Sequence, residues 1–115
     1  MYVSQKAKSE QTAAAVEEMV RRIVDGFSPE KVILFGSHAR GDAGADSDID
    51  LLVVVKCDRD TRAKLIEIRR ALADLPVAKD VIVVTPEYFA RYRDVVGTVV
   101  WPATHEGRVL YERAA

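Results

Sequence analysis

The spacing of two short apolar runs constrains this chain most strongly. Residues 49–55 and 81–84 are rich in β-branched side chains, as buried strands are. Between them, residues 58–75 carry apolar side chains at helical spacing, and Pro76 ends the pattern. A helical connection of about 20 residues is long enough to join two parallel strands. The sequence therefore predicts a parallel βαβ unit.

The N-terminal part of the chain predicts one more helix and one more strand. Residues 9–26 carry apolar side chains at intervals of three and four, and Gly26 is a candidate stop signal. The apolar run 31–35 predicts a buried strand that ends abruptly at a glycine-serine pair. Residues 38–47 contain several glycines and alanines, which indicate a turn, a short helix and a loop.

The C-terminal part predicts shorter elements. Thr85 and Pro86 have the residue types of an N-cap and of a first helical residue. Residues 98–106 indicate another helix, which Pro102 is expected to distort. Residues 108–111 are either an edge strand or an extended tail.

Length and composition narrow the class of protein. The 115 residues suit one domain, so we expect residues 1–115 to form a single domain of α/β (α+β) class, with a small mixed three-stranded sheet flanked by helices. A net charge of −1 gives no electrostatic reason to expect nonspecific nucleic-acid or membrane binding. Cys57 is the only cysteine, which excludes an intrachain disulfide and favours a reducing, cytoplasmic location. The apolar runs are too short to span a bilayer.

Three aspartates stand where two of the predicted strands begin. Asp48 and Asp50 open the strand over 49–55, and being two residues apart on a strand they should point to the same face. Asp80 opens the next strand, and parallel strands begin at the same edge of a sheet. Carboxylates this close repel one another unless a cation neutralises them, and their hard oxygens suit Mg²⁺. Taken singly, each could equally be a solvated polar residue.

The pair Gly36-Ser37 adds a second kind of chemistry. A glycine at a strand end lets the backbone approach a ligand closely, and the following N–H and hydroxyl can hold a phosphate. Alone, such a pair is more often just a turn. If the strand over 31–35 is antiparallel to the other two, however, its end lies at the edge that carries the aspartates. The sequence then predicts a phosphate-binding turn beside three carboxylates.

These residues resemble a known family. The run Gly36-Ser37-His38-Ala39-Arg40-Gly41, followed by Ser47-Asp48-Ile49-Asp50-Leu51, resembles the signature of the DNA polymerase β-like nucleotidyltransferase superfamily. Within it, the chain most resembles the minimal nucleotidyltransferases, the MNT proteins, over most of its length. The resemblance implies a nucleotidyltransferase fold and an enzyme that moves a nucleoside monophosphate from an NTP to a hydroxyl.

The resemblance also implies roles for the site residues. Gly36 and Ser37 would hold the β- and γ-phosphates, while the three aspartates would bind two Mg²⁺ ions. Asp80 would also help to activate the attacking hydroxyl. Arg40 and Ser47 are further candidates for binding the nucleotide. For Arg40, contact with phosphate or with a partner is weighed equally against a solvent-facing role. Ser47 either bonds a phosphate or shapes the loop alone, and a packing or surface role is expected for His38.

The family resemblance finally implies a partner. MNT proteins resemble the antitoxin of a pair whose toxin is a HEPN-domain ribonuclease, and the implied reaction transfers AMP from ATP to a tyrosine of that toxin. One alternative is a non-catalytic antitoxin that neutralises the toxin by forming a complex. Another is an enzyme that modifies a small-molecule acceptor. The sequence leaves open the nucleotide, the number of transfers and whether the chain forms homo- or hetero-oligomers.

Overall fold

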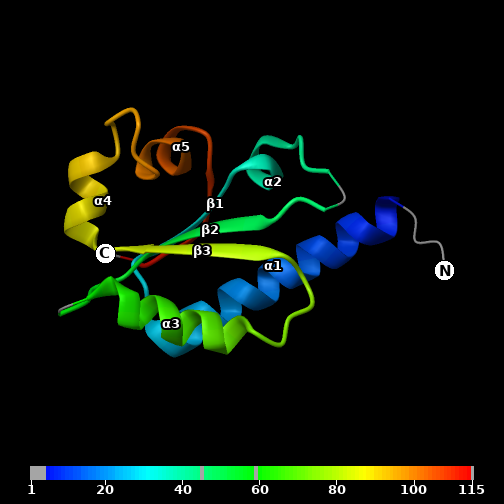
Figure 1. Ribbon diagram of the computed structural model, residues 1–115, viewed down its shortest axis with the longest axis horizontal. Helices are drawn as coiled ribbons and strands as arrows, with labels where there is room; N and C mark the ends of the chain where they lie inside the picture. Colours follow the sequence, from blue (N-terminus) through cyan, green and yellow to red (C-terminus); the bar gives the residue numbers. More distant parts are fainter. Residues whose placement is uncertain (1–4, 45, 59, 115) are drawn as a thin grey trace.

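The computed structural model describes residues 5–44, 46–58 and 60–114, with side chains from Glu10 onward. Its helices and strands follow one another along the chain in this order: α1 (Gln5–Phe27), β1 (Lys31–Phe35), α2 (Ser37–Arg40), β2 (Ile49–Val54), α3 (Thr61–Leu72), β3 (Lys79–Val84), α4 (Pro86–Tyr92), α5 (Val100–His105) and β4 (Arg108–Glu112). Figure 1 shows these elements arranged around one twisted sheet.

The strands form a mixed sheet in the order β3-β2-β1-β4. β2 and β3 are parallel and are joined through α3, which confirms the predicted βαβ unit. β1 is antiparallel to β2 and to β4. The expected number of three strands was wrong, because residues 108–112 pair with the free edge of β1 instead of forming a tail. Residues 108–112 form a strand because their backbone pairs with β1, which is distant in the sequence. A half-exposed run of five residues gives little indication of such pairing in its own sequence.

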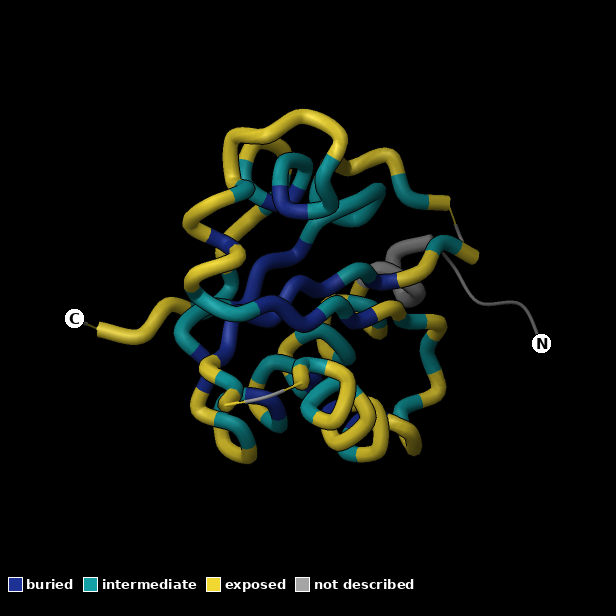
Figure 2. Tube along the Cα trace, turned by 60° about the vertical axis from the view of Figure 1, so that its left-hand side comes forward, coloured by how far each residue is buried: buried dark blue, intermediate teal, exposed yellow. Residues whose placement is uncertain are grey.

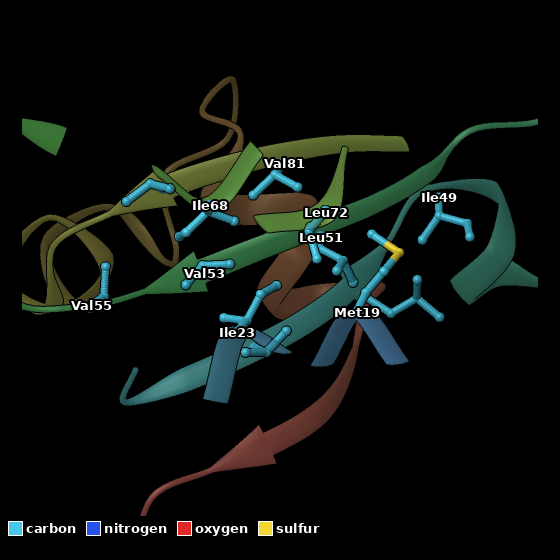
Figure 3. Packing of buried hydrophobic residues seen from close by; sticks show 12 residues of the cluster. Met19, Ile23, Ile49, Leu51, Val53, Val55, Ile68, Leu72 and Val81 are labelled. Atoms are coloured by element: carbon cyan, nitrogen blue, oxygen red, sulfur yellow. The ribbon is translucent and has the colours of Figure 1, made fainter. Parts of the chain in front are cut away.

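Helices cover both faces of the sheet (Figure 1). On one face α1 and α3 pack over the larger core, part of which Figure 3 shows, with Met19 and Ile23 lying against Leu51 and with Ile68 near Val81. On the other face α4 and α5 cover a smaller core: Ile33, Leu52, Val54, Val84, Phe89, Val100 and Ala103. The central strands are therefore buried on both sides, as the dark segments in Figure 2 show.

The ends of the helices follow local sequence rules with two differences. Thr85 is the N-cap of α4, where its hydroxyl accepts a hydrogen bond from the Tyr88 N–H at 3.1 Å, as predicted. Gly26 does not stop α1, which continues to Phe27 before Ser28 adopts a φ of 47°. Pro102 does not distort α5, because it lies in the first turn, where its missing N–H would have no helical acceptor. None of the described helices has the length and hydrophobicity needed to cross a membrane.

Candidate active site

Asp50 and Asp80 are direct neighbours across the two parallel strands. In the β2–β3 register Asp50 is paired with Asp80, and in the β1–β2 register it is paired with Phe35. Adjacent strands lie about 4.8 Å apart, and paired residues project to the same face of a sheet. That face is the one covered by α4 and α5, since Asp50 alternates with the buried Leu52. Asp50 is partly buried and Asp80 is exposed, so this row of the sheet remains open to a ligand.

Asp48 lies just outside the strand. β2 begins at Ile49, so the alternation of a strand does not determine where the Asp48 side chain points, and the same-face prediction does not apply to it. The next peptide is nevertheless anchored, because the Ile49 N–H donates to the carbonyl of Ala78 at 2.9 Å. Asp48 is exposed at the same sheet edge as the other two aspartates.

Gly36 brings the turn after β1 into contact with Asp50. Its φ of 74° and ψ of −156° belong to a region that only glycine occupies readily. A Cβ on Gly36 would collide with Oδ2 of Asp50 and would lie 3.2 Å from its Cγ. The glycine is therefore needed twice, for the backbone conformation and for the space that the carboxylate fills.

α2 begins directly after this glycine. The carbonyl of Gly36 accepts hydrogen bonds from the N–H groups of Ala39 and Arg40, each at 3.1 Å. As in any first helical turn, the N–H of Ser37 has no acceptor within the helix. Gly41 closes the turn with a φ of 86°. Ser37 thus begins a helical turn directly after the glycine that contacts Asp50, and its role in binding phosphate stays a prediction.

The other predicted nucleotide-binding residues lie around this turn. Arg40 is exposed and forms an ion pair with Asp42 at 3.3 Å. The Ser47 hydroxyl accepts a hydrogen bond from the Gly44 N–H at 2.8 Å, so it shapes the loop before β2. His38, for which the sequence predicted a packing or surface role, bonds through Nε2 to the Ser47 carbonyl at 3.0 Å. Sequence patterns gave no signal for this contact, because it joins a helix to a loop of irregular conformation.

The electrostatics of the site disfavour a charged Asp50. Burial raises the pKa of Asp50 above its ordinary value, and the negative charges of Asp80 and Asp48 raise it further. The positive charges of His38 and Arg40 act in the opposite direction without cancelling this rise. Such a carboxylate is stabilised in its ionised form by an additional nearby cation.

The donor set fits a hard divalent cation, although the side chains do not form a finished coordination sphere. Within the part of the chain that the structure describes, no three His, Cys, Asp or Glu side chains stand close enough together to hold one ion. Asp50 and Asp80 offer carboxylate oxygens from paired positions, which suits Mg²⁺. The pairing of the partly buried Asp50 with a second carboxylate, which raises the pKa of Asp50, favours a cation here. Binding of two ions by all three aspartates stays a prediction.

One cavity adjoins this cluster and has His38 and Ser47 in its lining. Its volume is about 710 Å³, and it opens between α1 and the loop before β2, on the face of the sheet covered by α1 and α3. Val16, Leu34 and Leu110 are among the residues that line it, whereas the three aspartates are absent from its walls. The polar cluster and not this hollow is the candidate active site, because only the cluster combines carboxylates with a phosphate-binding turn.

Comparisons with known proteins agree with this geometry. A family model described as a nucleotidyltransferase domain matches residues 16–101, a range that contains Gly36, Asp48, Asp50 and Asp80. "Putative protein adenylyltransferase MJ0604" of Methanocaldococcus jannaschii is 34% identical over 105 residues, which cover 84% of this chain and 95% of that protein. "Putative protein adenylyltransferase MJ0141" of the same organism is 28% identical over 78 residues, which cover 65% of this chain and 62% of that protein.

Solved structures share the fold. A crystal structure of "a putative nucleotidyltransferase from Sulfolobus solfataricus" matches with a TM-score of 0.67 at 24% identity, covering 98% of this chain and 93% of that chain. A structure described as "the toxin-antitoxin with AMP-PNP" matches with a TM-score of 0.61 at 21% identity, covering 84% of this chain and 73% of that chain. These comparisons and the site geometry together confirm the resemblance seen in the sequence. The chain therefore belongs to the nucleotidyltransferase domain family and is a nucleotidyltransferase.

Proposed function

We propose that this nucleotidyltransferase transfers AMP from ATP to a hydroxyl group of a partner protein, and that the partner is a HEPN-type toxin modified on a tyrosine. The observation that carries the proposal is the pairing of Asp50 with Asp80 on parallel strands while Gly36 holds the phosphate-binding turn against Asp50. The names of the adenylyltransferase relatives support transfer of AMP to a protein, and the name of the toxin–antitoxin structure supports a toxin as the partner.

The glycine-serine turn binds the triphosphate in this proposal. Ser37 offers its N–H and its hydroxyl to the β- and γ-phosphates, and Gly36 lets the phosphates approach because it has no side chain. Arg40 on α2 and Ser47, which contacts α2 through His38, add a positive charge and a hydroxyl. To bind the phosphate, Arg40 must break its exposed ion pair with Asp42. The free-energy cost is small, because an exposed ion pair contributes little stability in water.

The aspartates would hold Mg²⁺ against the phosphates. Asp48 and Asp50 supply oxygens near the turn, and Asp80 supplies one from the neighbouring strand. When bound, Mg²⁺ would neutralise charge on the α-phosphate and on the leaving pyrophosphate. The protein's own contribution is to keep the carboxylates and the turn on one rigid sheet edge, so that little reorganisation accompanies the reaction.

The remaining step concerns the acceptor. Its hydroxyl oxygen attacks the α-phosphorus, a new P–O bond forms, and the bond from the α-phosphorus to the bridging oxygen breaks to release pyrophosphate. The hydroxyl proton passes to the carboxylate of Asp80. Asp80 suits this role because it is exposed and lies on β3, which is an edge strand of the sheet. A hydroxyl carried by a large protein can reach an edge strand more easily than a central one.

The test compares two double variants of equal charge. Asp48→Asn with Asp50→Asn removes two site carboxylates, whereas Asp46→Asn with Asp58→Asn removes two exposed carboxylates outside the site. Each purified protein is incubated with ATP labelled at the α-phosphate, Mg²⁺ and the co-expressed partner. The mass of the partner is then measured by mass spectrometry. Wild type and control should add whole AMP units to the partner, and the site variant should add none.

The same variants separate this function from its alternatives. If the site variant protects cells from the toxin as well as wild type does, the protein acts by forming a complex and its enzymatic role as antitoxin fails. If wild type labels an antibiotic or another small molecule but no protein, the acceptor is a small molecule. Labelling of neither class with any NTP would contradict the proposed reaction itself.

A further inference from the structure

We infer that His38 is a positioning residue, which holds Asp48 in place relative to the glycine-serine turn. The inference rests on the proposed function in so far as that function makes Asp48 a ligand of the catalytic cation. His38 follows Ser37 directly in α2, and its Nε2 lies 3.0 Å from the carbonyl oxygen of Ser47, the residue that precedes Asp48. One side chain thus joins the phosphate-binding turn to the segment that carries Asp48.

The chemistry of this contact determines which partner is the donor. A carbonyl oxygen only accepts hydrogen bonds, so Nε2 must carry the hydrogen and donate it. A nitrogen that donates to the protein backbone cannot at the same time take a proton from an acceptor hydroxyl. Nε2 is therefore committed to the Ser47 carbonyl, which is the contact that a positioning role requires.

The backbone around Asp48 is held on both sides. The Ser47 carbonyl is fixed by His38, and the Ile49 N–H donates to the Ala78 carbonyl on the approach to β3 at 2.9 Å. Asp48 itself is exposed and lies before the strand, so sheet pairing on its own anchors only one of its two flanking peptides. Without His38, the peptide between Ser47 and Asp48 can rotate, and the carboxylate moves with it.

The rest of the loop cannot replace this contact. Ser47 and Gly44 form a small closed unit, in which the Ser47 N–H donates to the Gly44 carbonyl at 3.2 Å and the Gly44 N–H donates to the Ser47 hydroxyl at 2.8 Å. Both bonds are internal to the loop. Arg40 reaches only Asp42, at the start of the loop. Among the described residues, His38 is the side chain of α2 that connects to the end of the loop.

Two neutral variants test the inference. In His38→Gln the side-chain amide nitrogen reaches about as far as Nε2 and can donate to the Ser47 carbonyl, whereas in His38→Asn it is one bond too short. The two variants have the same charge and the same functional group, so they differ only in reach. His105→Asn serves as a control, because His105 contacts Asp94 and not the site.

The measurements are AMP transfer to the partner protein and amide hydrogen exchange at Gly44 and Ser47. We expect His38→Gln and the control to retain kcat within about threefold, and His38→Asn to lose about 10- to 100-fold in kcat, as displaced catalytic groups do. The KM for ATP should change little in each variant, since the glycine-serine turn is intact. Exchange at both amides should become faster in His38→Asn alone.

Three results would overturn the inference. Full kcat in His38→Asn would show that the contact does not position Asp48, and a loss in His38→Gln as large as in His38→Asn would show that the imidazole itself is required. If wild type transfers no AMP, the proposed function fails, and hydrogen exchange alone decides about His38. In that case equal exchange in His38→Asn and wild type would disprove the positioning role, and faster exchange would support it.

Discussion

Oδ2 of Asp50 occupies the space where a Cβ of residue 36 would stand, so the carboxylate packs directly against the backbone of Gly36. Gly36 ends the connection from β1 to α2, and Asp50 lies one strand away on β2. This contact places a negatively charged group of the sheet beside the turn expected to bind phosphate. The carboxylate and the turn are thereby kept adjacent by packing that leaves no room for a side chain at position 36.

Substitution of Gly36 should damage both stability and activity. In Gly36→Ala the φ of 74° becomes strained and the new Cβ collides with Asp50. We expect a loss of about 1–3 kcal/mol in the free energy of unfolding and loss of AMP transfer, measured by urea denaturation and by labelling of the partner. In Gly26→Ala, a helical site with nothing within 4 Å of the new Cβ, stability should instead rise by about 0.5–1 kcal/mol. If Gly36→Ala and Gly26→Ala changed the free energy of unfolding equally, the close contact of Gly36 with Asp50 would be contradicted.

Asp50 should lower the stability of the free protein at neutral pH. Its raised native pKa means that the folded state holds this proton more tightly than the unfolded state, so stability is lost as the pH rises through the native pKa. Asp50→Asn removes that loss and should increase the free energy of unfolding at pH 7 by about 0.5–2 kcal/mol. Near pH 3, below the usual aspartate pKa of about 3.9, both states bind the proton and the gain should vanish.

Denaturation of wild type and Asp50→Asn between pH 3 and about 8 measures this difference from below the usual aspartate pKa to slightly above neutral pH. Asp46→Asn is the matched control, because Asp46 is exposed. A constant difference between the Asp50 variant and wild type at every pH would mean that packing and not charge is responsible.

A divalent cation should reverse the effect of Asp50 on stability. Mg²⁺ bound to the native carboxylates stabilises the folded protein by about 1.4 kcal/mol when its concentration is ten times the Kd. We expect MgCl₂ to raise the Tm of wild type but not that of Asp50→Asn. NaCl at the same ionic strength is the control for charge screening, and an equal rise with NaCl would argue against a specific ion.

Ser47 should act on the nucleotide as well as on its own loop. Its hydroxyl oxygen already accepts a hydrogen bond from the Gly44 N–H, which leaves the hydroxyl proton for a phosphate oxygen. Ser47→Ala should raise the KM for ATP by about tenfold, since a hydrogen bond to a charged group is worth about 1.5 kcal/mol or more. Ser47→Thr, which retains the hydroxyl, should keep the KM near that of wild type. An unchanged KM in Ser47→Ala would leave the residue with a loop-shaping role only.

Local sequence rules predicted the elements that depend on neighbouring residues. The N-cap at Thr85 and the helical crossover before β3 follow from side chains a few positions apart, and both were found where expected. The strand at the C-terminus was harder to predict, because half-exposed residues in a short run suit an edge strand and a tail equally well. Ser28, not Gly26, takes the left-handed conformation after α1, which the turn into β1 requires.

The sequence by itself determined the chemistry of the site: a glycine-serine pair after one strand, aspartates where two others begin, and a crossover that makes those two parallel. Only the tertiary structure decided the register that pairs Asp50 with Asp80, the contact of Asp50 with Gly36 and the bond from His38 to Ser47. The physical reason is that residue types and spacing report on local conformation. Register and loop contacts instead depend on how distant segments pack, and packing minimises the free energy of the whole chain.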